Sequence, residues 1–230
     1  MRRKELQEER EERRRQEFRR SILRAAERVV VRRGYGAVTM DDIAHEAQVS
    51  KATLYKYFRS KAELPLEILA NFFEEIGQGV QRINRLDLSA GERLKRGIHF
   101  YLRYNEEKEN ISRIVMTDRA FTEKVNIFVS DEKGVTSEKD LQFITKMKAT
   151  RKKILRLVSE ILEEGIESEE FRPMDVAAAV LFLESLLQGY CHVRIWHEKP
   201  CSAKKAADIL CGFFLRGIER KAGPLKGVSS

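Results

Sequence analysis

The histidines, carboxylates and hydroxyls of this chain do not fall into a catalytic or metal-binding pattern. His45 and Glu46 are adjacent, but no second histidine follows at the spacing that zinc requires. The sequence also lacks a phosphate-binding glycine loop, a dinucleotide-binding motif and the motif surroundings of a serine hydrolase. We therefore expect no enzymatic activity, no metal site and no cofactor.

The three cysteines, Cys191, Cys201 and Cys211, are an odd set without metal-ligand spacing. Two of them fall on apolar helix faces, so we interpret all three as small buried side chains in a reducing cytoplasm. The alternative is a thiol that senses oxidation.

Side chains suited to nucleic-acid contact gather between residues 39 and 61. They are cationic, hydroxyl-bearing or small, and they are Thr39, Ser50, Lys51, Ala52, Thr53, Tyr55, Lys56, Tyr57 and Lys61. Lysine and hydroxyl groups bind phosphate oxygens, and small or hydroxyl-bearing residues can approach base edges. This combination favours DNA binding. The alternative is the solvated face of an ordinary helical hairpin.

Residues 39–58 contain the starts of two short helices that would position these side chains. Thr39 is a good N-cap for the first helix, and Asp41 and Asp42 then stand at the positive end of the helix dipole. The same signal recurs at Ser50, which caps the second helix. Only a tight turn separates the two.

Two helices of about two turns each are not stable alone in water, so both must dock on a larger element. Leu54 and Phe58 are four residues apart and share the face that would dock. Two short helices with a tight turn between them predict a helix-turn-helix. In that arrangement the N-terminal residues of the second helix contact base edges in the major groove.

A longer helix over residues 17–33 is predicted to support the pair. Its apolar positions recur at helical spacing from Phe18 to Val30, and Gly34 ends it. Its expected role is to cover the apolar side chains of the two short helices.

A fourth helix is predicted to follow, running to about residue 82. Ser60 and Glu63 form a capping box at its start, and Lys61 in its first turn is placed for a phosphate. Pro65 falls past the first turn, so we expect it to bend the helix and to act as a hinge.

The segment resembles the DNA-binding domain of the tetracycline-repressor (TetR) family over about residues 18–69. The residues that carry the resemblance are Ile43, Ala44, Ala47, Val49, Ser50, Thr53, Leu54, Tyr55, Tyr57, Phe58, Ser60 and Lys61. Gln48 stands where the family usually has glycine, and Ala52 where it has glycine or a similarly small residue. We expect either a left-handed backbone at Gln48, at a cost of about 1 kcal/mol, or a slightly different turn.

The net charge of +8 is concentrated at the N-terminal end. Residues 1–61 hold 17 Lys and Arg against 10 Asp and Glu, a balance of +7, and the remainder holds 27 against 26, or +1. The excess therefore lies where phosphate neutralisation needs it. Residues 1–16 interleave arginine with glutamate, which predicts a solvated helical extension or a frayed tail with a weak field. A basic arm that contacts DNA is the alternative.

The rest of the chain also reads as helical. Helices are expected over residues 89–105, 110–122, 137–167, 173–196 and 202–220, with a loop at 128–136. The chain is therefore predicted to be all-α, with an N-terminal three-helix helix-turn-helix domain and a C-terminal helical domain. The expected division is a charged extension (1–16), a DNA-binding domain (17–64), a ligand-binding and dimerisation domain (65–223) and a tail (224–230).

Residues 176–196 are apolar on nearly every face, and residues 202–220 add further apolar positions. One subunit of this size cannot cover both helices, so we expect a homodimer that pairs them as a four-helix bundle. The longest wholly apolar run, 176–183, is too short for a membrane span, and the N-terminal end lacks a secretory signal. We therefore expect a cytoplasmic protein that binds no membrane.

Polar or aromatic residues on otherwise apolar faces are the candidates for an effector pocket. They are His99, Tyr101, Tyr104, Arg113, Thr150, Arg151, Tyr190 and Trp196. For the histidines the alternative is an ordinary core or interface role. The family resemblance implies a small-molecule effector that binds between these helices and shifts the protein between two states.

Together these features predict a dimeric, ligand-responsive transcription regulator, most simply a repressor, that binds a pseudo-palindromic operator in double-stranded DNA. As the resemblance implies, its two recognition helices would enter successive major grooves about 34–36 Å apart. A nonspecific architectural DNA-binding protein is the alternative.

Overall fold

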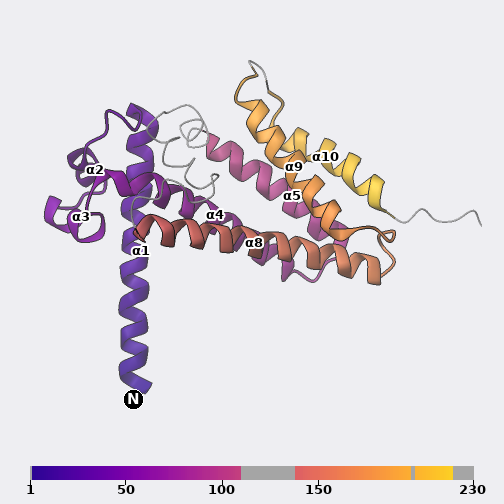
Figure 1. Ribbon diagram of the computed structural model, residues 1–230, viewed down its shortest axis with the longest axis horizontal. Coiled ribbons are helices and arrows are strands. Elements are labelled where there is room, and N and C mark those ends of the chain that lie inside the picture. Colours follow the sequence, from indigo (N-terminus) through magenta and orange to yellow (C-terminus); the bar gives the residue numbers. More distant parts are fainter. Residues whose placement is uncertain (1, 110–137, 198–199, 220–230) are drawn as a thin grey trace, which may run out of the picture. The chain divides into compact units, whose positions relative to one another are not determined.

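The computed structural model describes residues 2–109, 138–197 and 200–219. These residues form eight α-helices and no β-strand, as the sequence predicts (Figure 1). They divide into two compact units: the first holds the chain up to Glu74 and α8 up to Lys148, and the second holds Glu75–Glu109 and the chain from Ala149. The helix and loop expected at 110–122 and 128–136 lie outside the described residues.

Helix α1 (Arg2–Arg33) is the support helix of the first unit. It begins well before residue 17, so the described part of the expected extension is helical and continuous with it. Gly34 ends α1 with a φ of 74°, and its N–H donates to the Val30 carbonyl at 2.8 Å. Glycine suits this left-handed position because it has no Cβ.

Helices α2 (Met40–Glu46) and α3 (Lys51–Tyr57) start at the two predicted caps. The Thr39 hydroxyl accepts from the Asp42 N–H at 3.2 Å, and the Asp42 carboxylate accepts from the Thr39 N–H at 2.9 Å. The Ser50 hydroxyl accepts from the Thr53 N–H at 3.1 Å. Gln48 lies between the two helices with a φ of 55°, which confirms the expected left-handed conformation.

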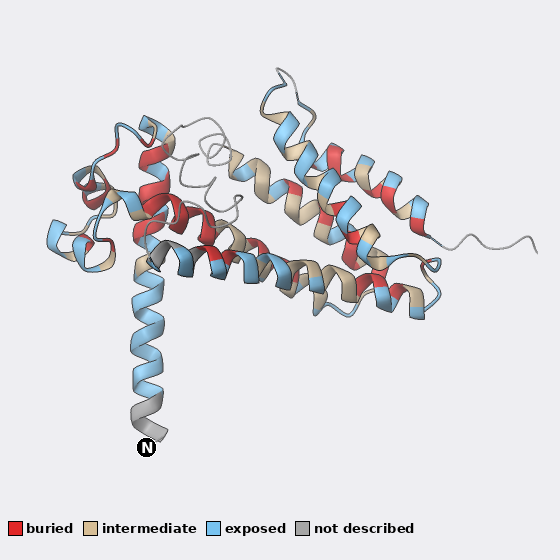
Figure 2. Ribbon diagram, viewed as in Figure 1, coloured by how far each residue is buried: buried red, intermediate tan, exposed pale blue. Residues whose placement is uncertain are grey.

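The core of the first unit lies where α1, α2, α3 and the start of α4 meet. Its fully buried side chains include Ile22 of α1, Ile43 of α2, and Leu54 and Phe58 from the α3 segment. Figure 2 shows this burial in the C-terminal half of α1, whereas residues 6–18 are exposed on every side.

Helix α4 (Leu64–Asn84) begins differently from the prediction. Ser60 makes no side-chain cap bond, and Glu63 instead accepts from the Arg59 N–H at 3.3 Å. A 3₁₀ turn, η1 (Lys61–Glu63), precedes the helix, so Pro65 is its second residue. The backbone nitrogens in the first turn of an α-helix have no hydrogen-bond partner within the helix, so a proline there removes no bond. The prediction that Pro65 bends the helix therefore has no physical basis.

A small cluster extends the first unit beyond the expected boundary at residue 64. Leu66, Leu69 and Ala70 of α4 are buried against Ile144 and Met147 of α8 (Glu138–Glu167). This packing places the division between the two compact units at Glu74 and Glu75.

The second unit is built around α5 (Ala90–Glu107), which packs against α9 (Val176–Arg194) and α10 (Ala203–Ile218). Its core includes Leu94, Ile98 and Leu102 of α5 and Leu162 of α8.

Pro173 does not begin α9, contrary to the prediction. The helix starts after Asp175, whose carboxylate accepts from the Ala178 N–H at 3.0 Å. The segment before it is extended because the Arg172 N–H donates to the Ile218 carbonyl at the end of α10, at 2.8 Å.

Large apolar side chains remain exposed on α9 and α10 and in the turn that follows α9. They are Leu181, Phe182, Leu186 and Val193 of α9, Trp196 after it, and Ile209 and Phe213 of α10. The wholly apolar run at 176–183 is short, yet α9 as a whole is long and apolar enough to cross a membrane by length and composition alone, with a mean hydropathy of 1.4.

We predict that Phe58→Ala destabilises the first unit while leaving the exposed face of α3 chemically unchanged. Phe58 is fully buried, and removing a buried phenyl ring costs about 3–5 kcal/mol. Urea unfolding followed by circular dichroism measures the loss. Tyr55→Ala is the control, since Tyr55 is 48% exposed and its loss should stay within about 0.5 kcal/mol. Equal losses in the two variants would contradict the packing.

Candidate nucleic-acid interface

Helix α3 presents one polar face to solvent and one apolar face to the core. Lys51, Ala52, Tyr55 and Lys56 are exposed, and Thr53 and Tyr57 are partly so. Leu54 and Phe58, the two fully buried side chains, hold the other side. Lys51, Ala52, Tyr55 and Lys56 therefore face outward as expected, whereas Tyr57 packs against the core of the first unit.

Thr39 and Ser50 are exposed but already serve as helix caps. The Ser50 hydroxyl also lies 2.9 Å from the Thr53 hydroxyl. The Thr39 hydroxyl also donates to the Asp42 carboxylate at 2.7 Å, so its single proton is already used. In the Ser50–Thr53 pair one hydroxyl donates to the other, which leaves one hydroxyl proton for an additional partner.

Lys51 is joined to Asp41 across the turn, with Nζ 2.5 Å from Oδ2. This hydrogen bond and the carboxylate charge raise the pKa of Lys51. The contact ties the start of α3 to the start of α2 and orients the lysine side chain. Sequence reasoning treated Asp41 only as a helix-dipole residue, because no spacing rule links residues on either side of a turn.

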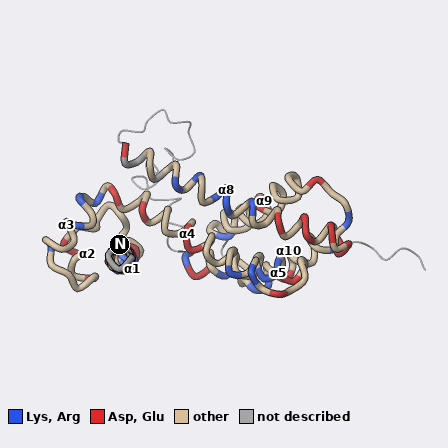
Figure 3. The backbone as a smooth tube through the Cα atoms, turned by 90° about the horizontal axis from the view of Figure 1, so that it is seen from below, with Lys and Arg blue, Asp and Glu red and all other residues tan. Residues whose placement is uncertain are grey.

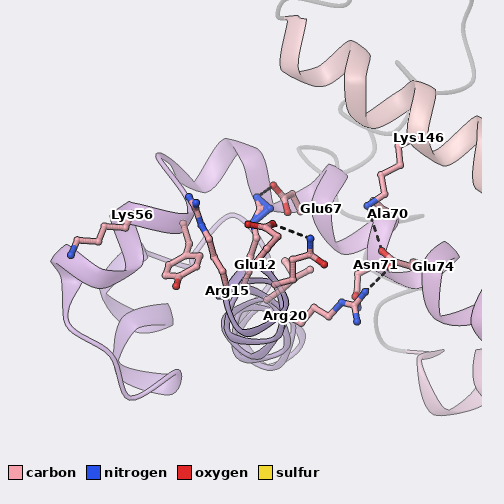
Figure 4. Close-up of a pocket in the computed structure, with 13 residues that line it drawn as sticks. Glu12, Arg15, Arg20, Lys56, Glu67, Ala70, Asn71, Glu74 and Lys146 are labelled. Atoms are coloured by element: carbon pink, nitrogen blue, oxygen red, sulfur yellow. Dashed lines mark hydrogen bonds and ion pairs between the residues drawn. The ribbon is translucent and has the colours of Figure 1, made fainter. Parts of the chain in front are cut away.

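Lys56 and Tyr57 lie at the end of α3 that approaches α1. The Tyr57 ring packs against Phe18 of α1 with centroids 5.2 Å apart. Both residues line an open groove with α1, α4 and Lys146 of α8, shown in Figure 4. Arg15 of α1 lines the same groove, a cation that the sequence analysis did not place near α3.

Lys61 departs from its expected role as a phosphate ligand. Its ammonium group donates to the carbonyls of Gly36 and Val38, both at 2.8 Å, and lies 4.8 Å from the centre of the Tyr35 ring. These bonds fasten the loop after α1 to the start of α4. Lys61 is therefore better assigned to holding the domain together than to binding DNA.

Ion pairs fix α2 on the side of α1. Glu46 accepts hydrogen bonds from Arg32 and from Arg28, the latter at 2.7 Å from Nε, and Arg33 binds Asp42 at 2.6 Å. The bonds from Arg32 and Arg28 lower the pKa of Glu46 to about 2. All of these groups are solvated, so each pair is individually weak, but together they set the orientation of α2.

Most of the described effector candidates make separate polar contacts within the second unit. Tyr190 donates to the Cys201 carbonyl at 2.7 Å, and Tyr104 donates to Glu75. His99 Nε2 is 3.1 Å from Asp208. Trp196 is 66% exposed, so it does not line an interior site, and Arg113 lies outside the described residues.

Three of the candidates do lie in the same region, between α5, α8 and α9. Arg151 binds Glu184 of α9 through two hydrogen bonds of 2.8 and 2.6 Å. Burial raises the pKa of Tyr101, with smaller contributions from the nearby Cys191 and Glu184. Thr150 lies one residue before Arg151 and faces Gly77 of α4.

Two of the cysteines are protonated thiols at neutral pH. Burial raises the pKa of Cys191 to about 12 and that of Cys211 to about 11. Because the thiolate is the reactive form, these two residues suit the structural role that the sequence predicts better than the redox role.

A buried support helix, two short capped helices and an exposed cationic face define a helix-turn-helix DNA-binding protein. A family model described as "Bacterial regulatory proteins, tetR family" matches residues 22–68, and one described as "QacR-like protein, C-terminal region" matches residues 128–218. The chain belongs to the tetR family of transcription regulators.

Two curated relatives are similar to the chain. The transcriptional activator FasR of Mycolicibacterium smegmatis is 35% identical over 109 residues, so the match spans 47% of this chain and only 50% of FasR. The transcriptional repressor KstR2 of the same species is 26% identical over 206 residues, which are 88% of this chain and 91% of KstR2.

Solved structures share the fold. PfmR of Thermus thermophilus matches with a TM-score of 0.63 and 25% identity, covering 86% of this chain and 99% of PfmR. A Saccharomonospora viridis protein solved with choline matches with a TM-score of 0.64 and 21% identity, covering 90% of this chain and 100% of that protein. The second likeness is one of fold alone.

We predict an acid-dependent loss of stability that Glu46 controls. The pKa of Glu46 is lowered from 4.5 to about 2 in the folded state. Its contribution to the free energy of unfolding is therefore complete above about pH 4.5 and disappears as the pH falls toward 2. The difference in thermal midpoint between wild type and Glu46→Gln should therefore shrink over this range. In an Arg28→Gln/Arg32→Gln background the same difference should be small at every pH. A pH-independent difference in the wild-type background would refute the role of the arginines.

Proposed function

We propose that the protein is a dimeric, ligand-responsive transcription repressor that binds a pseudo-palindromic operator through α3. The observation that carries the proposal is the rigid seating of α3, whose buried Leu54 and Phe58 turn Lys51, Tyr55 and Lys56 to solvent. A helix held in this way is already ordered, so little conformational entropy is lost when it enters a major groove.

The proposed contact set is Thr39, Ser50, Lys51, Ala52, Thr53, Tyr55, Lys56 and Tyr57. The lysines and hydroxyls provide phosphate contacts that set the register, and Ala52, Thr53 and Tyr55 are placed to face base edges. Lys61 is left out because its ammonium group is occupied inside the domain.

Repression is favoured over activation by the extent of the similarity. The repressor KstR2 is similar over 88% of this chain, whereas the activator FasR is similar over 47% of it. Repression needs only occupancy of an operator, which a protein with a DNA-reading unit and a dimerising unit can achieve.

Dimerisation is supported by the exposed apolar side chains of α9 and α10. Phe182 is 65% exposed and Phe213 is 75% exposed, and covering such rings releases about 25 cal/mol per Å² of apolar surface. A second copy would cover these faces symmetrically as a four-helix bundle. Two copies would then present two α3 helices to successive major grooves.

A small-molecule effector is supported by the relatives. One similar structure is of a ketosteroid transcriptional regulator, KstR2, and others hold choline and triclosan. In this chain the proposed effector region lies around Tyr101, Arg151 and Glu184, where a half-buried tyrosine and an exposed bidentate ion pair border the apolar core. His99, Thr150 and Tyr190 remain candidates at its margin.

Control of DNA binding by the effector requires a link between the two units. Helices α4 and α8 both continue through the division, at Glu74–Glu75 and at Lys148–Ala149. An effector that binds one arrangement of the second unit more tightly would shift the population away from the DNA-binding state. A coupling of about 1–3 kcal/mol is sufficient.

DNase footprinting on the region upstream of the encoding gene tests the proposal. We expect a discrete footprint with two half-sites, and a steep fall of affinity as salt rises. Lys56→Gln should make the slope of log K against log salt concentration shallower by about 0.9, the value for one phosphate contact. A similar salt slope without a discrete footprint would instead support a nonspecific architectural DNA-binding protein.

Dimerisation has its own test, in Leu181→Glu. Leu181 is 58% exposed on α9, so a glutamate is tolerated in the monomer but would be buried at the interface. We expect the dimer to weaken roughly 100-fold or more, measured by analytical ultracentrifugation, and operator affinity to fall with it. Leu141→Glu on α8 is the matched control, since Leu141 is also exposed at 39%. An unchanged Leu181→Glu dimer, or wild-type protein that pellets with lipid vesicles, would contradict the proposed interface.

A further inference from the structure

The N-terminal part of α1 projects beyond the helix-turn-helix. Every residue from Leu6 to Phe18 is exposed, as Figure 2 shows. We refer to residues 6–16 as the α1 arm. The arm is helical and continuous with the buried part of α1, so the direction of each side chain follows from the helical period.

Arg10 and Arg14 of the α1 arm lie on the side of α1 that carries α2 and α3. Arg10, Arg14 and Phe18 follow one another at intervals of four residues and share a face. Phe18 packs on Tyr57 of the α3 segment. Farther along the same side, Arg32 pairs with α2. The row that begins at Arg10 therefore leads directly to the helix-turn-helix.

Glu8 and Glu12 lie on another side of the arm. Glu8 and Glu12 are four residues apart, and Gln16 continues the row and donates to Glu12 at 3.0 Å. Arg19, which follows in the same direction, binds Glu67 of α4. Figure 3 views α1 end-on from its N-terminal end and shows α3 on one side of it and α4 on the other. The acidic row is therefore the one that faces toward α4.

Arg15 joins the arginine row to the recognition helix. It lines the groove that also contains Lys56 and Tyr57 (Figure 4). Glu11 lies between Arg14 and Arg15 on the helix surface, and Glu12 lines the groove together with Arg15. The cationic excess on this side of the arm is therefore greatest at Arg10 and Arg14, and Arg15 lies at its border with the groove.

The arm arginines have no carboxylate partner, unlike most of the arginines in the rest of α1. Arg19, Arg20, Arg28, Arg32 and Arg33 each bind an Asp or Glu of α2 or α4. Within the described part of the chain, the arginines of residues 6–16 form no ion pair. Their guanidinium groups are open to an external anion.

The composition of the arm selects among possible partners. A coiled-coil partner or a membrane surface needs an apolar stripe, and Leu6 is the single large apolar side chain among residues 6–16. Exposed ion pairs with another protein helix would contribute little. A polyanion with closely spaced charges fits better, because each arginine that neutralises a phosphate releases a condensed counterion.

We propose that the α1 arm is a second DNA-binding element, in which Arg10, Arg14 and Arg15 contact backbone phosphates flanking the half-site that α3 occupies. The proposal rests on the proposed function, since it requires a bound operator. The arm extends for about 15 Å at 1.5 Å per residue, which matches about four phosphates along one strand at 3.4 Å each. It supplies affinity without base specificity.

The decisive experiment compares two neighbouring arginines. Arg14→Gln removes a charge from the proposed DNA side, and Arg13→Gln removes the same charge from a position 100° further round the helix. The salt dependence of operator affinity is measured for both by fluorescence anisotropy. We expect Arg14→Gln to make the slope of log K against log salt concentration shallower by about 0.9. If the two proteins bind equally at 1 M salt, this corresponds to about eightfold weaker binding at 0.1 M. Arg13→Gln should behave as wild type.

A second readout uses the length of the DNA. Wild-type protein should bind more tightly when a duplex that ends at the half-sites is extended by ten base pairs on each side. The Arg10→Gln/Arg14→Gln variant should lose most of that gain. Circular dichroism checks that the helix persists, as glutamine is a good helix former.

Equal slopes for Arg13→Gln and Arg14→Gln would overturn the proposal, as would a wild-type affinity that does not respond to flanking DNA. Failure of the proposed function looks different, because wild-type protein would then give no discrete footprint on any duplex. A discrete footprint with no effect of Arg10→Gln/Arg14→Gln would leave the regulator intact and remove the arm from its DNA contacts.

Discussion

The burial of Leu54 and Phe58 against α1 is the interaction on which the rest of the first unit depends. Helices α2 and α3 have seven residues each, too few to be stable alone. Their order comes from the shared core with Ile22 and Ile43. Because one face of α3 is held in this way, its opposite face is presented as a fixed array, and the capping bonds at Thr39 and Ser50 set where that array begins.

Charge in the first unit is divided between cations that are bound within the fold and cations that are left on exposed surfaces. Arg28, Arg32 and Arg33 are bound to carboxylates of α2, and Lys61 is bound to two backbone carbonyls. These cations orient helices that have few apolar contacts of their own. The cations of α3 and of the α1 arm lie on surfaces that the core leaves exposed. A count of positive charges along the chain does not separate these groups, since both are arginine and lysine in one segment.

The second unit shows a similar division between satisfied and unsatisfied surface. Its polar side chains are largely bound within the unit, as with Arg151 to Glu184 and Tyr190 to the Cys201 carbonyl. Its apolar surplus remains on α9 and α10, where Phe182 and Phe213 are mostly exposed. Since an exposed ring has no partner other than water in one subunit, a second copy is the simplest way to cover it. An effector that enters near Tyr101 would have to compete with hydrogen bonds already made there.

Local signals in the sequence determined the helices of the DNA-binding unit, the caps at Thr39 and Ser50, the left-handed Gln48 and the outward face of α3, because each depends on neighbours within a few residues. The tertiary structure alone decided the use of Lys61, the start of α9 after Pro173, the exposure of Trp196 and the place of Arg15 in the groove that Tyr57 also lines. Each of these depends on residues distant in the chain that become neighbours only when helices pack. Interleaved Arg and Glu in the α1 arm read as mutually cancelling along the sequence, but a continuous helix with 3.6 residues per turn sorts them onto different sides.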